Sequence, residues 1–296
     1  MGLSGDVRLL PRRRGHALRE LWVIGDVHGA YGKLRAMLLR AGLIDFDGGW
    51  TAGDAHLVFL GDYMDRGSRG VEVVRLIRSL EVQASEHGGK VTALLGNHEV
   101  MFLAAILFRR SDPEDALGFR DYWQSNGGQD RDLTLLDPGD LAWLEARPAM
   151  ALVDSWLMVH ADSTMYLRLG TTIAQVNGYV RSLLRGRDAD AWGSFLNSFA
   201  DRFAFVVGGG ERTARRTLST FGGQHLAHGH TPVYVLLDEY LHGPTLGAGA
   251  PIPYAERLCV ALDSGMAYRD DAGFIARLDD RGIAEVISNP GSGPAY

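Results

Sequence analysis

The sequence predicts an α/β fold, and three observations indicate it. The first hundred residues alternate regularly between short apolar segments and segments with helical spacing. Short strand-like segments return in the second half of the chain. The 296 residues are 46% hydrophobic, which is enough for a sizeable buried core. Strand–helix alternation of this kind favours a largely parallel sheet with helices packed against it.

Three strands and three helices are predicted before residue 109. The predicted strands are the apolar runs 21–25, 56–61 and 90–96. The predicted helices are 31–42, 70–88 and 98–108, in which apolar residues recur three and four positions apart. Gly88 and Gly89 are expected to end the second of these helices.

After residue 108 the pattern is less regular. An inserted loop or pair of helices is predicted over 111–130, a helix over 138–148, and a hairpin or two successive strands over 150–161. Residues 165–222 have mostly helical spacing. A strand at 224–229 follows, and then several short strands through 287, interrupted by a loop rich in glycine and proline at 242–254.

The chain is expected to form one domain over residues 21–288, which includes the mostly helical segment 165–222. An N-terminal extension, 1–20, would precede this domain. A flexible tail, 289–296, would follow it.

Composition excludes several classes of protein. The net charge of −6 gives no reason to expect nucleic-acid binding. Cys259 is the one cysteine, so an intramolecular disulfide is impossible and a reducing compartment is compatible with the sequence. The first twenty residues lack the apolar region of a secretory signal, and the longest apolar run, 101–108, is too short to span a membrane. We therefore expect a cytoplasmic protein without membrane partners.

Polar side chains follow five of the predicted strands. They are Asp26 and His28 after the first strand, Asp62 after the second, Asn97 and His98 after the third, and then His160, His228 and His230. In an extended chain, residues two apart point the same way, which would bring Asp26 and His28 together. Ligands of open α/β sheets bind beyond the carboxyl ends of strands, so these side chains are predicted to converge on one crevice.

Each of these residues also has a structural explanation when taken singly. An aspartate after a strand is commonly a turn or helix cap, and Asn97 could cap the helix that it precedes. A lone histidine at a strand end, such as His160 or His228, is usually half-buried with its hydrogen bonds satisfied. The ordered set of motifs favours a shared site over five separate structural roles.

The residue types in this set suit a metal-dependent hydrolase. Carboxylate, amide and imidazole donors without thiolate favour Mn, Fe, Zn or Mg in an open site. One carboxylate can bridge two cations about 3.5–4 Å apart, and such a pair can lower the pKa of a bound water to give a hydroxide nucleophile. An arginine can hold two phosphoryl oxygens, and a histidine that is not a ligand can protonate the departing oxygen.

Five segments carry a resemblance to a known family. They are GDVHG (25–29), GDYMDRG (61–67), GNHE (96–99), VHAD (159–162) and HGHTP (228–232). Together they resemble the phosphoprotein-phosphatase branch of the calcineurin-like metallophosphoesterases, in a bacterial form similar to phage lambda phosphatase and the Shewanella-like phosphatases. The resemblance implies a four-layer α-β-β-α sandwich of two mixed sheets, with two metal ions at the carboxyl ends of the strands.

The resemblance also assigns a role to each matching residue. The implied metal ligands are Asp26 and His28 for the first ion, Asp62 bridging both, and Asn97, His160 and His230 for the second. His98 matches the general acid, and Asp65 matches the carboxylate that pairs with it and favours the imidazolium form. Arg66 matches a phosphate-binding arginine, and Asn97 also matches a substrate-binding position. Glu99 is similar to a residue that supports the ligands.

Three assignments stay open at this point. A second phosphate-binding arginine is expected between the fourth and fifth motifs; Arg202 is the candidate, and Arg168 and Arg185 compete with it. Asp263 follows a predicted strand and could lie near the site, although a turn role is favoured. Pro232 stands where nuclease-like relatives carry a second histidine, which favours the phosphatase branch.

The predicted activity is hydrolysis of phosphate monoesters, with phosphoserine, phosphothreonine or phosphotyrosine in proteins, or small phosphate esters, as substrates. Two divalent ions, with Mn favoured over Fe, Zn or Mg, are the expected cofactors. The first alternative is hydrolysis of dinucleoside polyphosphates or phosphodiesters at the same metals. The second is an inactive module that binds phosphorylated partners.

Overall fold

A computed structural model describes residues 19–109, 111–241 and 250–292 of this chain. The predicted N-terminal extension therefore lies outside the described residues, apart from Arg19 and Glu20. The predicted tail is described only in part. Asn289 donates a backbone hydrogen bond to the carbonyl of Gly273 at 2.7 Å, and Pro290–Ser292 form a 3₁₀ turn. Residues 293–296 lie outside the described part.

The first sheet has the strand order β10-β9-β1-β2-β3. Its strands are β1 (Leu21–Ile24), β2 (His56–Phe59), β3 (Lys90–Ala93), β9 (Phe274–Asp279) and β10 (Gly282–Ser288). Strands β1, β2 and β3 are parallel, with Val23 opposite Val58 and Val58 opposite Thr92. Strand β9 pairs with β1, and β10 with β9, in the antiparallel sense.

The second sheet has the order β4-β5-β6-β8-β7. Its strands are β4 (Met150–Val153), β5 (Trp156–Val159), β6 (His225–Pro232), β7 (Ile252–Tyr254) and β8 (Cys259–Asp263). Strands β5, β6 and β8 are parallel, whereas β4 and β7 are antiparallel to their neighbours. Each sheet thus combines both strand directions, as the resemblance implied. The parallel arrangement that alternation indicated for the first hundred residues is found in β1, β2 and β3, and the antiparallel strands of that sheet come from the end of the chain.

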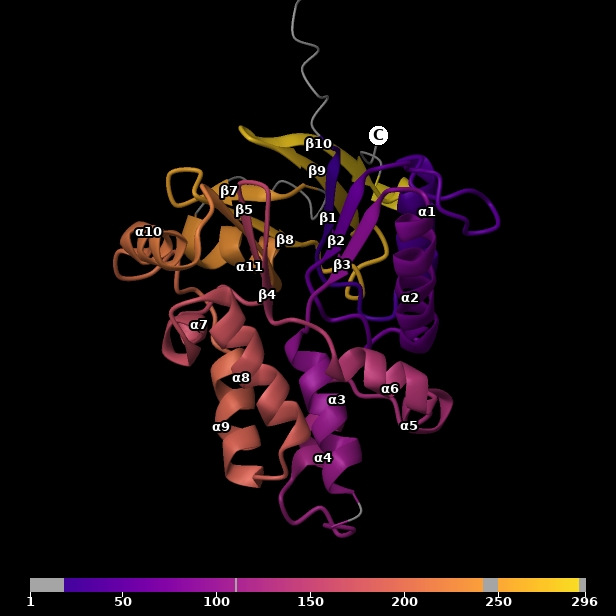
Figure 1. Cartoon of the computed structure of the whole chain (residues 1–296), viewed down its shortest axis with the longest axis vertical. Coiled ribbons are helices and arrows are strands. Elements are labelled where there is room, and N and C mark those ends of the chain that lie inside the picture. Colours follow the sequence, from indigo (N-terminus) through magenta and orange to yellow (C-terminus); the bar gives the residue numbers. More distant parts are fainter. Residues whose placement is uncertain (1–18, 110, 242–249, 293–296) are drawn as a thin grey trace, which may run out of the picture.

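Helices flank the sheets and extend below them (Figure 1). They are α1 (Tyr31–Arg40), α2 (Gly70–Glu86), α3 (Asn97–Phe108), α4 (Phe119–Ser125), α5 (Asp132–Leu135), α6 (Pro138–Glu145), α7 (Met165–Leu169), α8 (Ile173–Arg185), α9 (Ala189–Phe199), α10 (Gly210–Phe221) and α11 (Val233–Leu236). Helices α1 and α2 lie beside the first sheet, and α10 and α11 contact the second. The predicted sandwich of two mixed sheets with helices is therefore confirmed.

Two predictions after residue 232 are wrong in detail. Short strands were expected there, but Val233–Leu236 form α11 and Leu237–Leu241 continue as a π-helical turn. Val233 and Leu236 are fully buried, and α11 contacts β6 and β8, so packing overrides the strand propensity of the valines. Ile252–Tyr254, within the predicted loop, pairs with β8 as strand β7.

The central strands form a core that is closed on both faces. Every residue of β1, β2 and β5 is buried, as is typical of strands covered on each side. Rigid, buried strands give the segments that follow them fixed starting points. None of the helices in the described part of the chain is both long and apolar enough to cross a membrane.

Candidate active site

The turns that follow β1 and β2 are bonded to each other. The backbone amides of Val27 and His28 both donate to the carbonyl of Asp62, at 3.0 and 2.9 Å, and Gly67 donates to the carbonyl of His28 at 2.9 Å. Position 67 must be glycine because a Cβ there would lie 2.2 Å from that carbonyl oxygen. The two turns therefore form one unit that holds the site residues on both of them.

Several site residues adopt a left-handed backbone conformation, which is uncommon outside glycine. They are His28 (φ 46°), Asp62 (53°), Asp65 (66°), Arg66 (59°) and His230 (64°). Strained positions of this kind persist where the surrounding structure fixes them, and they are concentrated at functional sites. The expectation of an extended chain from Asp26 to His28 is wrong, because His28 lies in a turn.

Asp62 lies between two groups of donor side chains. Its Oδ2 is 3.5 Å from Nε2 of His28, whose ring also lies 3.8 Å from Oδ2 of Asp26. Its Oδ1 is 3.4 Å from Nε2 of His160. A ligand atom of His230 lies within 4.8 Å of those of Asp62 and His160. The two oxygens of one carboxylate thus face different histidine groups.

Asn97 and His230 complete the second group. Oδ1 of Asn97 lies 2.9 Å from Nε2 of His160. The backbone amide of His230 donates to Oδ1 of Asp26 at 2.9 Å, which connects β6 to the turn after β1. All six predicted ligands are therefore together in one place, although they come from both sheets.

The outward-facing ring nitrogens of the histidines are bonded to backbone carbonyls. Nδ1 of His28 lies 2.9 Å from the carbonyl of Met64, and Nδ1 of His160 lies 3.0 Å from that of Leu60. Such bonds fix the tautomer that leaves the lone pair of Nε2 on the side of the ring that faces Asp62. This is the arrangement that metal-binding histidines have in proteins.

Burial dominates the charge state of the cluster. It raises the pKa of Asp26 well above the usual range, with Asp263 and Asp62 adding to the shift, and burial followed by Glu99 does the same for Asp62. Burial also lowers the pKa of His28 and of His160. Neutral imidazoles beside buried carboxylates that repel one another are what a pair of divalent cations would stabilise. The donor set fits the metal centre that the sequence predicts.

His98 and Asp65 form a hydrogen-bonded pair at the edge of this cluster. Nδ1 of His98 lies 2.7 Å from Oδ2 of Asp65, while its Nε2 lies 3.9 Å from Oδ2 of Asp62. Burial lowers the pKa of His98 well below its usual value, and Arg66 and Arg202 lower it further. Burial and the two guanidinium groups therefore oppose the imidazolium form that pairing with Asp65 was predicted to favour. Burial raises the pKa of Asp65 to about 7.

Glu99 connects the turns that carry the predicted ligands. Its carboxylate accepts hydrogen bonds from the backbone amides of Asp62 at 2.9 Å, Tyr63 at 2.8 Å and Gly96 at 3.1 Å. These bonds connect the turn after β2 to the turn after β3. The supporting position that the resemblance implies for Glu99 agrees with these contacts.

Two arginines lie at the cluster. Nη1 of Arg66 contacts Nε2 of His28, and its guanidinium lies 4.9 Å from the ring centre of Tyr268. Arg202 donates from Nη1 to the carbonyl of His230 at 2.7 Å, and its charge lowers the pKa of His230 after burial. Its competitor Arg168 is instead 3.5 Å from Asp201, with both side chains about half exposed.

The position of Arg202 depends on Asp162, which the sequence analysis did not assign. Asp162 accepts hydrogen bonds from the backbone amide of Phe203 at 2.8 Å and from Oγ1 of Thr231 at 2.5 Å. It thereby fixes the segment that carries Arg202 against β6. The sequence signal was the aspartate that ends VHAD, the fourth motif. Arg185, the other competitor, is an exposed residue at the end of α8.

The remaining candidates have structural contacts. His228 is buried and hydrogen-bonds the hydroxyl of Tyr254 through Nε2 at 2.7 Å, as expected of a satisfied core histidine. Asp263 accepts from the amide of Gly265 at 2.8 Å, which agrees with the turn role. Asp263 also lies close to Asp26, which agrees with the stated possibility that it lies near the site.

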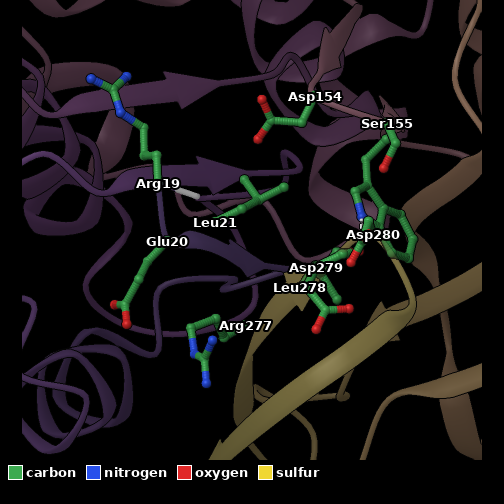
Figure 2. A pocket seen from close by; sticks show the side chains of 10 residues that line it. Arg19, Glu20, Leu21, Asp154, Ser155, Arg277, Leu278, Asp279 and Asp280 are labelled. Atoms are coloured by element: carbon green, nitrogen blue, oxygen red, sulfur yellow. Dashed lines mark hydrogen bonds between the residues drawn. The ribbon is translucent and has the colours of Figure 1, made fainter. Parts of the chain in front are cut away.

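A separate pocket of about 220 Å³ lies away from this cluster (Figure 2). Leu21 and Trp156 line it at the starts of β1 and β5, together with Leu278 near the end of β9. The metal-ligand candidates follow the opposite ends of β1 and β5. The pocket in Figure 2 is therefore not part of the candidate active site.

Comparison with known families identifies the domain. The family model of the calcineurin-like phosphoesterases matches residues 20–234. The chain belongs to the calcineurin-like phosphoesterases. Members of this family use a dinuclear centre of divalent metal ions, and the cluster around Asp62 is compatible with one.

The curated relatives of this calcineurin-like phosphoesterase include proteins named as phosphatases and proteins named as tetraphosphatases. The chain is 40% identical over 82 residues to Shewanella-like protein phosphatase 2 of Arabidopsis thaliana, covering 28% of this chain and 21% of the relative. It is 33% identical over 200 residues to the symmetrical bis(5'-nucleosyl)-tetraphosphatase of Methylococcus capsulatus, covering 63% of this chain and 62% of the relative. The chain thus spans less than two thirds of the length of either.

Solved structures show the same fold. The cold-active protein-tyrosine phosphatase of a psychrophilic Shewanella species superposes with a TM-score of 0.67 at 20% identity, covering 92% of this chain and 78% of that one. A protein serine/threonine phosphatase from Saccharomyces cerevisiae gives 0.54 at 16% identity, covering 91% and 80%. At these identities the likeness concerns the fold.

Proposed function

We propose that this phosphoesterase hydrolyses phosphate monoesters, with phosphoserine, phosphothreonine or phosphotyrosine in proteins as its substrate class. The observation that carries the proposal is the position of Asp62 between two groups of donors. Its Oδ2 faces His28 at 3.5 Å and its Oδ1 faces His160 at 3.4 Å. A carboxylate with this placement can bridge two cations, as in other two-metal hydrolases.

Asp26, His28 and Asp62 would hold one ion, and Asp62, Asn97, His160 and His230 the other. When bound, two divalent ions supply Lewis acidity and activate water at neutral pH. Oxygen and imidazole ligands without thiolate favour Mn, with Fe, Zn and Mg as alternatives. The chain itself holds the donors in place through buried turns and ring-to-carbonyl bonds.

Arg66 and Arg202 would bind and orient the phosphoryl group. A guanidinium presents two parallel N–H donors that match two phosphoryl oxygens. Arg66 lies on the His28 side of the cluster and Arg202 on the His230 side. Binding between them would fix the phosphorus against the metal ligands, and Asn97 lies within the same cluster.

His98 would donate the proton that the leaving oxygen needs. Asp65 holds Nδ1, which leaves Nε2 free to face the substrate. The negative charge of a bound phosphate favours the imidazolium and so opposes the effect of burial on the pKa of His98. Proton donation by a positioned side chain contributes about 10²–10⁴-fold to rate.

The His98→Asn variant tests this assignment. We expect kcat for phosphopeptides to fall by roughly 10²–10⁴ while the metal content stays the same, because only the acid is removed. His87→Asn is the matched control, since His87 is an exposed residue after α2. Turnover of His98→Asn near the wild-type rate would show that His98 is not the acid.

Hydrolysis of dinucleoside polyphosphates is the second candidate, and one observation favours it. The tetraphosphatase of Methylococcus capsulatus aligns over 200 residues, whereas the Shewanella-like phosphatase aligns over 82. The same metals and the same acid would serve this reaction. Selection between the two therefore depends on the substrate and not on the metal centre.

A substrate panel distinguishes the candidates. The chelated protein is reloaded with Mn, Mg, Fe or Zn and given phosphopeptides, p-nitrophenyl phosphate, diadenosine tetraphosphate and bis-p-nitrophenyl phosphate. Preference for phosphopeptides supports the proposal, whereas preference for diadenosine tetraphosphate or the diester supports the alternative. Tight phosphopeptide binding without phosphate release would instead indicate an inactive binding module.

A further inference from the structure

Trp123, on the insertion after α3, reaches the predicted acid pair. Its indole Nε1 donates to Oδ1 of Asp65 at 2.8 Å. The other oxygen of Asp65, Oδ2, lies 2.7 Å from Nδ1 of His98. Both carboxylate oxygens therefore have a partner, and the one that does not face His98 is held by tryptophan. None of the predicted site residues lies in this insertion.

Trp123 is itself fixed in place. The side chain is fully buried and packs edge-on against Phe102, with ring centres 5.6 Å apart. Gly128 lies against the indole, and a Cβ there would be only 2.3 Å from Cε2. A tryptophan held this closely can impose an orientation on the group that it hydrogen-bonds.

The insertion that carries Trp123 also contacts Arg66. The backbone amide of Arg66 donates to the carbonyl of Gly127 at 2.7 Å. Asp65 and Arg66 both have positive φ, 66° and 59°, which costs a non-glycine residue free energy unless outside contacts fix it. Trp123 bonds the side chain of the first residue, and Gly127 bonds the backbone of the second. The insertion thus stabilises the turn that carries both.

We propose that Trp123 is a positioning residue for general-acid catalysis. Its indole N–H orients Asp65 so that Oδ2 faces His98, and His98 in turn presents Nε2 toward the leaving oxygen. The inference rests on the proposed phosphomonoesterase function and adds a residue to it. A purely structural tryptophan would fill space without controlling the acid.

Leaving-group dependence separates the two roles. A poor leaving group, as in phenyl phosphate, needs a proton from the acid, whereas 2,4-dinitrophenolate departs without one. Trp123→Phe retains most of the ring but loses the donor. Because hydrogen bonds to charged groups are the stronger kind, we expect kcat for phenyl phosphate to fall roughly 10–100-fold. The rate for 2,4-dinitrophenyl phosphate should change by less than about threefold.

Trp192→Phe is the matched control. Trp192 is also almost fully buried, and its Nε1 donates to the carbonyl of Gly186 at 3.3 Å, away from the acid pair. This variant should leave the ratio of the two rates unchanged. The ratio does not depend on the fraction of folded protein, so a partly unstable variant still gives a result. Gly128→Ala, which displaces the indole, should reproduce the effect of Trp123→Phe.

Two further variants separate failure of this inference from failure of the proposed function. His98→Asn should show the same leaving-group dependence, and Asp65→Asn combined with Trp123→Phe should lose little more than Asp65→Asn alone. The proposed role of Trp123 is wrong if Trp123→Phe lowers the rates for both esters equally, or lowers neither, while His98→Asn lowers mainly the rate for phenyl phosphate. A wild-type protein that hydrolyses neither ester overturns the proposed function and this inference with it.

Discussion

The two sheets contribute to the same site in different ways. The first places Asp26, Asp62 and Asn97 a few residues beyond β1, β2 and β3. In the second, His160 directly follows β5, and His230 lies in an irregular part of β6, after four intervening helices. The first half therefore forms its part of the site from short successive units, whereas the second brings in ligands that are distant in sequence.

The contacts between the halves show what this difference means. Nδ1 of His160 bonds to the carbonyl of Leu60, and the amide of His230 bonds to the carboxylate of Asp26. The second sheet thus takes the position of its ligands from groups on the first. A metal centre at these residues would hold the two sheets together, and the following predictions test that relationship.

The largest effect is expected at Asp62, which both halves share. Asp62→Asn loses the charge and the second anionic oxygen that faces His160. Activity should fall by at least about 10³-fold, and neither ion should be retained, because the ligand that the two ions would share loses its charge. Metal analysis and kcat/KM measure this. Retention of two ions would mean that each sheet binds its metal independently.

Removal of a ligand from the second sheet alone should have a more selective effect. His160→Gln retains the three donors around His28 but removes the imidazole that faces Oδ1 of Asp62. We expect one ion per chain in place of two, and activity reduced more than about 100-fold. Native mass spectrometry gives the stoichiometry. A variant that still holds both ions would show that His160 is dispensable for metal binding.

Arg202 should affect substrate binding more than metal binding. Arg202→Ala removes a guanidinium beside His230, so KM should rise by about tenfold or more while metal content is unchanged. Arg168→Ala is the control, because that side chain is half exposed and about 3.5 Å from Asp201. Similar kinetics for the two variants would contradict the assignment of Arg202.

His56 is expected to make the stability of the first half depend on pH. It is the first residue of β2 and lies at the end of that strand opposite the predicted ligands. Burial, followed by Lys90 and Arg19, lowers the pKa of His56 to about 4. As pH falls, His56 therefore takes up a proton in the unfolded chain before it does so in the folded chain. The contribution of neutral His56 to the free energy of unfolding is fully present above about pH 6.5 and is lost as pH falls toward 4. His56→Gln should show a smaller loss of melting temperature between pH 7 and 5. An identical loss in both proteins would exclude His56 as the cause.

The smallest effect is expected in the helical segment of the second half. Gly178 is exposed within α8, and a Cβ there meets no atom within 4 Å. Gly178→Ala should raise the free energy of unfolding by about 0.5–1 kcal/mol, because alanine favours the helix, and leave activity unchanged. Gly210→Ala should instead destabilise, since a Cβ there lies 2.1 Å from the backbone of Phe205. Urea denaturation compares the two.

Sequence reasoning predicted the first half well because its information is local. Apolar runs located β1, β2 and β3 within a few residues, and the polar residues after them are the ones that meet around Asp62. It failed at 233–241, where Val233 and Leu236 pack as a helix against the second sheet, although strands predicted further along the chain are present as β8, β9 and β10. Propensity describes a residue and its neighbours, and packing against distant strands can reverse it.

By itself the sequence determined the order of strands and helices in the first half and the chemical types available to the site. The sequence left three arginines open beside Arg66. That Arg202 lies at the cluster, on a segment held by Asp162, followed only from the tertiary structure. The contact of Trp123 with Asp65 is of the same kind. These contacts join segments that are far apart along the chain, and their geometry is set by burial and backbone turns. Local periodicity carries no information about such contacts.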